Sequence, residues 1–358
     1  MNEIRNGQPG WAAEAVHRAR VRGCLLGGAI GDALGYPVEF DSLAWIREAH
    51  GPRGVTGPLP DADGVVGRVS DDTQMTLFTV EGLQQAHARE RRKGIGGGWS
   101  RLLRSAYGRW LETQVKSGPD TDVNGGLLAQ PWLYARRAPG NACLSGLRSQ
   151  DHVPDPAAEL GPPGPVNPDS KGCGAVMRSA PFGLTRTSAE TAFGMAARCA
   201  QTTHGHPTGY YASGALAAIV THLVSGDSLE GAVLRTLRLL SRHPGHEETT
   251  TALTRALDLA SDGSPSAERL ESLGAGWIAE EALAMGVYCA LATPEVADAL
   301  LLSVNHSGDS DSTGSICGNL LGALHGDHGL PQEWLERIEG RTTITVLADD
   351  FAAECVRR

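Results

Sequence analysis

The sequence lacks paired cysteines, long apolar runs and clear strand patterns, and each absence excludes a class of protein. Seven cysteines are scattered through 358 residues without a CxxC pair, so neither a zinc cage nor a disulfide framework is indicated. No stretch of about 18 apolar residues occurs, and the segment MNEIRNGQPGW has no apolar core, so we expect neither a membrane span nor a signal peptide. These features predict buried, reduced thiols in a cytoplasmic protein.

Basic residues are also scarce. The chain has 31 Lys and Arg against 41 Asp and Glu, which gives a formal charge of −10. Binding to a nucleic-acid backbone depends on Lys and Arg charge, so we expect nucleic acid as a partner only in the form of a modified substrate. Hydrophobic residues make up 41% of the chain, which is enough for a sizeable core and excludes disorder as the overall class. The oligomeric state stays open.

Glycine, by contrast, is abundant: 46 residues against roughly 25 expected from average usage. Several stand four residues apart, a spacing that places them on one helix face and lets another backbone approach closely. We therefore predict two glycine-faced helices that are distant in sequence and packed together in a core. The two sets, which we call the glycine ladders, are Gly23, Gly27, Gly31 and Gly35, and Gly314, Gly318, Gly322 and Gly326.

Helical periodicity recurs along the chain, whereas Thr342–Val346 is the one fair strand candidate. We predict an all-α fold in one compact domain over residues 1–358, with a long Pro- and Gly-rich loop at about 117–174 that borders a functional site. The predicted helices are Trp11–Leu34 as one or two helices, Met75–Ala88, Trp99–Thr113, Ala189–Ala200, Tyr210–Leu223, Leu229–Leu240, Glu247–Leu259, Trp277–Leu291, Glu295–Val304 and Gln332–Ile338.

Two short segments combine carboxylates with hydroxyl side chains directly before predicted helices. They are Ser70-Asp71-Asp72-Thr73 and the segment GDSDSTG at 308–314. Helix capping explains one or two such residues, but four aspartates brought together would repel one another. Oxygen ligands of this kind suit a hard divalent cation such as Mg²⁺, Mn²⁺ or Ca²⁺. A shared metal site is therefore the better joint explanation.

Two rival motifs start at Asp309. The segment DSDSTG begins like a calcium-binding helix-loop-helix, but Leu320 stands where that loop requires a glutamate. It also fits the Asp-x-Asp-x-Thr nucleophile of haloacid-dehalogenase-type phosphatases, which should end a buried strand and work with a lysine. No strand pattern precedes it and no lysine follows Lys171, so the phosphatase is the weaker alternative.

Five motifs follow one another along the chain: Arg22–Gly35 with Glu39, Ser70–Thr73, Lys171–Arg178, Thr203-His204 and Gly308–Ser312. In this order they resemble the ADP-ribosylhydrolase family, which includes the glycohydrolase that reactivates dinitrogenase reductase. The resemblance extends from about residue 20 to residue 326. It implies a compact all-α fold and a binuclear Mg²⁺ or Mn²⁺ centre that hydrolyses the bond between ADP-ribose and an acceptor, which is a protein side chain, a nucleic-acid base or a small molecule. A relative that binds ADP-ribose without turnover is the alternative.

The resemblance also implies roles for individual residues. Glu39 and Asp309 are the implied proton-transfer residues. The implied metal ligands are Ser70, Asp71, Asp72, Asp309, Asp311 and Ser312. The implied substrate-binding residues are Asn124, Gly125, Gly126, Ser170, Lys171, Gly172, Cys173, Gly174 and His204.

Some of these assignments have ordinary alternatives. Cys173 replaces the asparagine that is usual in the family, which removes an amide from the pocket. Glu39 is otherwise a surface acid, His204 a core histidine and Lys171 a solvent-facing charge. Arg178 either contacts phosphate or forms a structural salt bridge.

Overall fold

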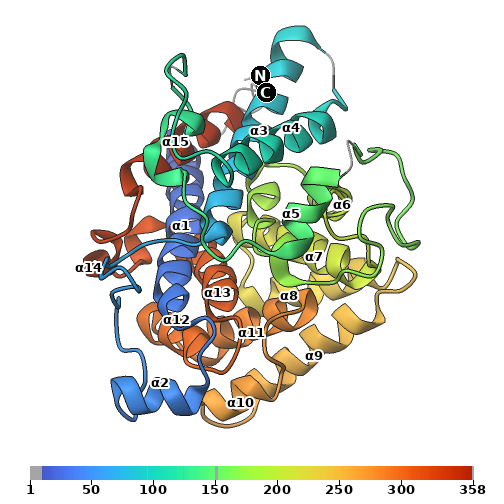
Figure 1. The fold of residues 1–358 in the computed structure, drawn as a ribbon. Coiled ribbons are helices and arrows are strands. Elements are labelled where there is room, and N and C mark those ends of the chain that lie inside the picture. The colour runs from blue at the N-terminus through green and yellow to red at the C-terminus, as the bar shows by residue number, and fades with distance from the viewer. Residues whose placement is uncertain (1–9, 95, 124, 150–151, 357–358) are drawn as a thin grey trace, which may run out of the picture.

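The computed structural model describes residues 10–94, 96–123, 125–149 and 152–356, and the regular structure within these ranges is helical. Apart from helices, they contain the isolated bridges Pro60–Val66 and Gly172–Ile278. The all-α prediction is confirmed (Figure 1). Among the described helices, none is long and apolar enough to cross a membrane.

The α-helices are α1 (Trp11–Gly35), α2 (Leu43–His50), α3 (Asp71–Lys93), α4 (Trp99–Thr113), α5 (Asn141–Ser149), α6 (Ala189–Ala200), α7 (Pro207–Val224), α8 (Leu229–Leu240), α9 (Glu247–Ser261), α10 (Ala267–Glu271), α11 (Ala279–Ala292), α12 (Val296–Val304), α13 (Ser310–His325), α14 (Gln332–Leu335) and α15 (Arg341–Val356). Short 3₁₀ turns join them at Tyr36–Val38, Leu127–Ala129, Pro131–Leu133, Cys173–Ala175, Ala180–Leu184 and Asp327–Gly329.

Most predicted helices are observed. Helices α4, α6 and α8 have the predicted bounds, α11 begins two residues later than predicted, at Ala279, and α14 is shorter than the predicted Gln332–Ile338. The sequence analysis did not predict the short helices α2, α5 and α10.

The strand prediction at Thr342–Val346 is wrong, because these residues lie inside α15. Their β-branched side chains favour a strand locally. However, Ile344, Ala348, Phe351 and Cys355 recur at helical spacing and are all buried. Packing of this apolar face against α1 and α3 outweighs the local strand preference.

Helices α1 and α13 lie side by side in the middle of the molecule (Figure 1), and their glycine ladders face each other. A Cβ atom added at Gly27 would lie 2.3 Å from the carbonyl oxygen of Gly318, so a side chain larger than hydrogen does not fit there. The predicted close packing of the two ladders is confirmed. The facing pairs run antiparallel: Gly23 with Gly322, Gly27 with Gly318 and Gly31 with Gly314.

This antiparallel contact determines where the acidic segments meet. Helix α1 ends at Gly35, where an added Cβ would lie 2.3 Å from the carbonyl oxygen of Ser310 at the start of α13. A single 3₁₀ turn separates Gly35 from Glu39, and Asp309 is the N-cap of α13. The end of one ladder helix therefore brings Glu39 next to the first turn of the other.

Asp32, in the last turns of α1, positions the remaining acidic segment. Its carboxylate accepts hydrogen bonds from the backbone N–H groups of Ser70, at 2.8 Å, and Thr73, at 3.0 Å. The side chain of Ser70 in turn accepts from the N–H of Asp72 and caps α3. Asp32 thus fixes the start of α3 against α1.

Candidate metal centre and substrate cleft

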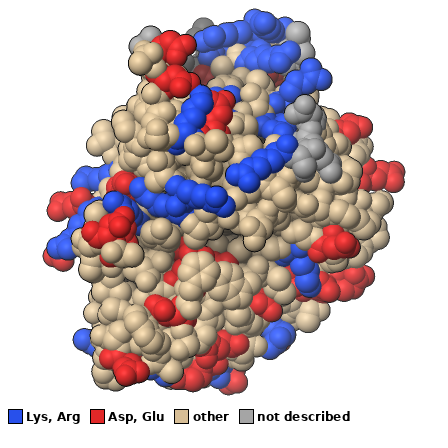
Figure 2. All heavy atoms as spheres, viewed as in Figure 1, with Lys and Arg blue, Asp and Glu red and all other residues tan. Residues whose placement is uncertain are grey.

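The two acidic segments and Glu39 open into one cavity of about 630 Å³. On the face of the molecule that is turned to the viewer, Figure 2 shows acidic side chains recessed in a hollow near the middle, with basic side chains above it. The Pro- and Gly-rich segment that was predicted as a loop contributes residues 138–142 and 172–174 to the lining, so parts of it lie beside the acidic residues. The acidic lining residues are Glu39, Asp71, Asp72, Asp309 and Asp311.

The carboxylates converge closely enough to share a cation. One ligand atom from each of Glu39, Asp309 and Asp311 lies within 4.8 Å of the other two, and all three side chains are buried. The hydroxyl of Ser312 lies 3.4 Å from Oδ1 of Asp72 and joins the second acidic segment to this group. Three buried carboxylate oxygens in the cavity have no hydrogen-bond partner: Glu39 Oε2, Asp71 Oδ2 and Asp72 Oδ2.

These groups cannot all carry charge in a buried site without a counter-charge. Burial, followed by the charges of Asp311 and Asp309, raises the pKa of Glu39 to about 11. Burial also raises the pKa values of Asp71 and Asp311 well above their usual range, and neighbouring aspartates add to both shifts. A divalent cation bound among the unpartnered oxygens would reverse this effect by favouring the charged forms. The donor set, with oxygen atoms only, therefore fits a hard cation.

Of the predicted metal ligands, Ser70 alone does not line the cavity. Its hydroxyl caps α3, and its residue is fully buried. The other predicted ligands lie at the cavity, and Asp309 and Asp311 belong to the group that converges with Glu39. The alternative of an exposed Glu39 is excluded, because that residue is 6% exposed.

The implied substrate-binding segment at residues 170–174 is held directly beside the acidic group. The N–H of Cys173 donates to the carbonyl of Trp277 at 3.1 Å, and the N–H of Ala279 donates to the carbonyl of Lys171 at 2.8 Å. The thiol of Cys173, which is partly exposed, donates to Oδ2 of Asp309 at 2.8 Å. As a result, Gly172, Cys173 and Gly174 all line the cavity.

Other predicted substrate residues lie elsewhere. The ammonium group of Lys171 forms ion pairs with Glu248 at 2.7 Å and Glu280 at 2.8 Å, so it is neither free in solvent nor directed at the cavity. Ser170, Gly125 and Gly126 do not line the cavity either. Asn124 lies outside the described residues.

His204 lines the cavity and is buried, with Nδ1 lying 2.8 Å from the hydroxyl of Thr203. Burial and the nearby charge of Arg178 lower the pKa of His204 to about 3, so the imidazole is neutral at neutral pH. Arg178 itself is buried over the ring of Tyr107 and donates to Thr203. The guanidinium of Arg178 donates to the neutral groups of Met75, Cys143 and Thr203, which differs from both the phosphate contact and the salt bridge considered for it.

Several lining residues were not found by sequence analysis. Phe40 and Trp277 lie at the mouth on the acidic side, and Arg136 and Asn141 come from the Pro- and Gly-rich segment. Phe40 directly follows Glu39, which was the available sequence signal for it. Trp277 and the loop residues belong to no motif, because their position depends on how distant segments fold together.

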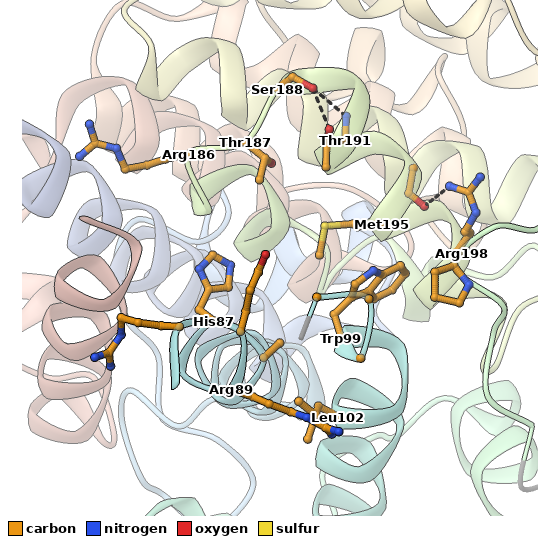
Figure 3. A pocket seen from close by; sticks show the side chains of 18 of the residues that line it. His87, Arg89, Trp99, Leu102, Arg186, Thr187, Ser188, Thr191, Met195 and Arg198 are labelled. Carbon is orange, nitrogen blue, oxygen red and sulfur yellow. Dashed lines mark hydrogen bonds between the residues drawn. The ribbon is translucent and has the colours of Figure 1, made fainter. Parts of the chain in front are cut away.

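A second, larger cavity of about 1070 Å³ lies at the other end of α3 (Figure 3). Its lining includes Trp99, Met195 and the guanidinium groups of Arg89 and Arg198. His87, which also lines it, is about 22 Å from Asp72 along the helix at 1.5 Å per residue. The converging carboxylates are absent from its lining residues, so the smaller cavity is the candidate active site.

Comparison with protein families identifies the class. The ADP-ribosylglycohydrolase family model matches residues 13–358, nearly the whole chain. The chain belongs to the ADP-ribosylglycohydrolase family, and with it to the hydrolases.

Similar proteins agree with this assignment. The chain is 26% identical over 331 residues to an ADP-ribosyl-[dinitrogen reductase] glycohydrolase of Rhodospirillum rubrum, covering 89% of this chain and 90% of that protein. It is 24% identical to the ADP-ribosylarginine hydrolase Tri1 of Serratia proteamaculans, covering 98% and 85%. It is 25% identical to the ADP-ribosylhydrolase ARH3 of Bos taurus, covering 96% and 94%.

A solved structure shares the fold. It is titled an ADP-ribosylglycohydrolase-related protein complex and superimposes with a TM-score of 0.67, at 22% sequence identity, over 95% of this chain and 99% of that chain. The helical architecture described above is therefore that of the family.

Proposed function

We propose that the chain is a metal-dependent hydrolase that cleaves the glycosidic bond between ADP-ribose and an acceptor and releases ADP-ribose, acting as one domain with two Mg²⁺ or Mn²⁺ ions. The observation that carries this proposal is the convergence of Glu39, Asp309 and Asp311 with three unpartnered buried carboxylate oxygens in one open cavity. Membership of the family supplies the reaction class.

Asp71, Asp72, Asp309 and Asp311, with Ser312, are the residues that would hold the cations. When bound, the cations supply charge balance and Lewis acidity toward the ribose hydroxyls. Ser70 acts on this centre indirectly, because its hydroxyl caps the helix that carries Asp71 and Asp72. It is a positioning residue in this proposal.

The bond to the acceptor breaks through an oxocarbenium-like state, as in other glycoside hydrolysis. This step needs a group that accepts a proton from the attacking water and a group that assists the departing acceptor. Asp309 is our candidate to accept the water's proton, because its carboxylate lines the cavity within the converging acidic group. Glu39, which converges with Asp309 and Asp311 at the cavity, is the candidate acid.

The remaining lining residues provide sites for ADP-ribose. We assign its diphosphate to the backbone N–H groups of Gly172 and Gly174 and to Arg136, an exposed guanidinium at the cavity rim. His204 is neutral, so it contacts the substrate by hydrogen bonding and adds no charge. The ammonium group of Lys171 does not bind the diphosphate, because it is already paired with Glu248 and Glu280.

For the acceptor we favour the guanidinium group of arginine. Two bound divalent cations would offset four of the five acidic charges that line the cavity, which leaves one negative charge to attract a cationic group. Two similar proteins, from Serratia proteamaculans and Pseudomonas putida, are named ADP-ribosylarginine hydrolases. We also place the protein in the cytoplasm, a proposal supported by its seven cysteines, none of which forms a disulfide.

The test is to offer ADP-ribosylated arginine, serine and nucleic-acid bases to the enzyme with Mg²⁺, with Mn²⁺ and with EDTA, and to measure free ADP-ribose. We expect release from ADP-ribosylarginine that falls at least 100-fold in EDTA and returns when the metal is restored. If nothing is released from any acceptor while ADP-ribose still binds tightly, the chain is a binding protein. Phosphate release from simple phosphate monoesters would instead indicate the phosphatase alternative.

A further inference from the structure

Two large aromatic side chains are exposed at the mouth of the acidic cavity. Phe40 is 74% exposed and Trp277 is 41% exposed. Their rings stack on each other, with centroids 5.6 Å apart and planes at 19°, and both residues line the cavity. A stacked aromatic pair facing solvent at a cavity mouth offers a flat surface to a ligand.

Exposure alone does not single out this pair. Trp11 is 84% exposed and Trp45 is 50% exposed, but neither lines the cavity. Phe40 and Trp277 combine exposure, mutual stacking and a position at the candidate active site. Trp45 therefore provides a matched control, because it is a similarly exposed tryptophan on α2.

The backbone holds both aromatic residues on the acidic side of the cavity. Phe40 directly follows Glu39 in the chain. The carbonyl of Trp277 accepts the N–H of Cys173, and a Cβ added at the preceding Gly276 would lie 3.4 Å from the Cβ of Asp309. The pair therefore stands beside the acids that converge for catalysis.

This position selects which part of the substrate the rings can contact, an argument that rests on the proposed function. The reacting carbon of ADP-ribose must lie at the acids, its diphosphate leads away from that carbon, and the adenine lies beyond the diphosphate. The acceptor leaves from the reacting carbon itself. The ring of Trp277 stacks on Phe40, which directly follows the acid Glu39, while the carbonyl of Trp277 accepts the N–H of Cys173 in the proposed diphosphate segment. The pair therefore lies at the reacting end of the substrate, where the acceptor leaves, and the adenine lies on the far side of the diphosphate.

We propose that Phe40 and Trp277 form a stacking platform for the acceptor side of the scissile bond and determine acceptor specificity. A planar, delocalised guanidinium fits such a surface, because it stacks on an aromatic face and is attracted by the ring electrons. The small hydroxyl-derived linkage of serine gains less from the same surface. The platform thus favours arginine-linked over serine-linked ADP-ribose.

The experiment compares Phe40→Ala, Phe40→Leu, Trp277→Ala and Trp277→Phe with Trp45→Ala on the metal-loaded enzyme. Steady-state hydrolysis of ADP-ribosylarginine gives KM and kcat, and inhibition by free ADP-ribose gives its Ki. We expect Trp277→Ala and Phe40→Ala to lower kcat/KM by about tenfold, mainly through KM. Trp277→Phe should retain most of the activity, and Trp45→Ala should match the wild type. The Ki of ADP-ribose should stay within twofold in every variant.

Three outcomes would overturn the platform. A parallel loss of ADP-ribose affinity would show that the rings hold ADP-ribose itself. A fall in kcat with unchanged KM in both Phe40 variants would show that Phe40 only positions Glu39. Unchanged kinetics in both alanine variants would show that the rings contact nothing in the complex.

The two proposals fail separately. If the wild type releases no ADP-ribose from any acceptor, the proposed hydrolase is rejected. The platform is then judged from the Kd values of ADP-ribosylarginine and of ADP-ribose, measured by calorimetry. Loss of affinity for ADP-ribosylarginine alone in the alanine variants supports it, and equal affinities in all variants reject it.

Discussion

At the scale of single residues, helix capping and metal ligation draw on the same side chains. Asp309 is the N-cap of α13 and its Oδ1 accepts the N–H of Ser312 at 3.3 Å, while Oδ2 faces the cavity wall at Cys173. Asp71 and Asp72 occupy the first turn of α3, where the helix dipole favours negative charge. Burial nevertheless raises the pKa values of both aspartates. Capping alone therefore does not compensate the cluster, which supports the proposed cation site.

Removing one negative ligand should remove bound metal. In Asp71→Asn and Asp311→Asn, the amide keeps the size of the side chain but loses the charge that holds a divalent cation. After gel filtration, elemental analysis should find each variant with at least one equivalent of Mn²⁺ fewer than the wild type. The activity of each variant should fall at least 100-fold. Asp258→Asn, an exposed acid on α9, is the control and should keep full occupancy. Full occupancy in either cavity variant would contradict the ligand assignment.

The sequence predicts the acidic residues of the site better than the neutral and basic ones. Four aspartates stand out because two hydroxyl-rich acidic segments have no common structural purpose other than a shared cation. Lys171 is the first residue of the motif Lys171–Arg178. Its ion-pair partners Glu248 and Glu280, however, belong to α9 and α11, far along the chain. Trp277 reaches the cavity through a backbone contact with Cys173. Such long-range contacts leave no local pattern for sequence analysis to detect.

At the scale of elements, the glycine ladders were predictable because their spacing has a direct geometric meaning. Glycine every four residues costs helix stability, and only close backbone contact explains such a repeated cost on two helices. The short helix α2 and the helix α15 carried no comparable signal. In α15, the β-branched start obscured an apolar helical face that becomes evident only with its partners α1 and α3.

The ladder contact should tolerate no side chain. A Cβ added at Gly318 would lie 1.9 Å from the carbonyl oxygen of Gly27, so Gly318→Ala must push α1 and α13 apart. We expect a loss of about 2–4 kcal/mol in unfolding free energy, measured by urea denaturation. Separation of the helices should also weaken metal binding, because the same contact aligns Glu39 with α13.

Gly108 provides the matched control for this substitution. It lies within α4, and a Cβ added there would meet only the end of the Arg104 side chain, at 3.7 Å. Gly108→Ala should therefore raise the unfolding free energy by about 0.5–1 kcal/mol through helix propensity. If both substitutions changed stability equally, close packing would not be the reason for the ladders.

At the scale of the whole molecule, the fold assembles its site from three segments that are remote in sequence. Glu39 follows α1, Asp71 begins α3 and Asp309 begins α13. The antiparallel ladder contact and the bracing by Asp32 bring them together. The formal charge of −10 would thus be offset by about four units when two divalent ions bind. We therefore expect the acidic cluster of the proposed active site to destabilise the fold when the cations are absent.

Metal removal should therefore destabilise the whole protein, and more so at high pH. In the metal-free fold, burial and mutual repulsion raise the carboxyl pKa values above their unfolded values, with Glu39 at about 11. A raised folded pKa means that the folded state binds protons more tightly than the unfolded state, so the metal-free protein loses stability as pH rises above about 4. Bound cations remove this penalty. We expect EDTA to lower the Tm by about 5 °C or more at pH 8 and by less at pH 5.5, measured by calorimetry with and without Mg²⁺. In Asp311→Asn the gap should shrink at both pH values, whereas a gap that does not depend on pH would rule out the acidic cluster as its source.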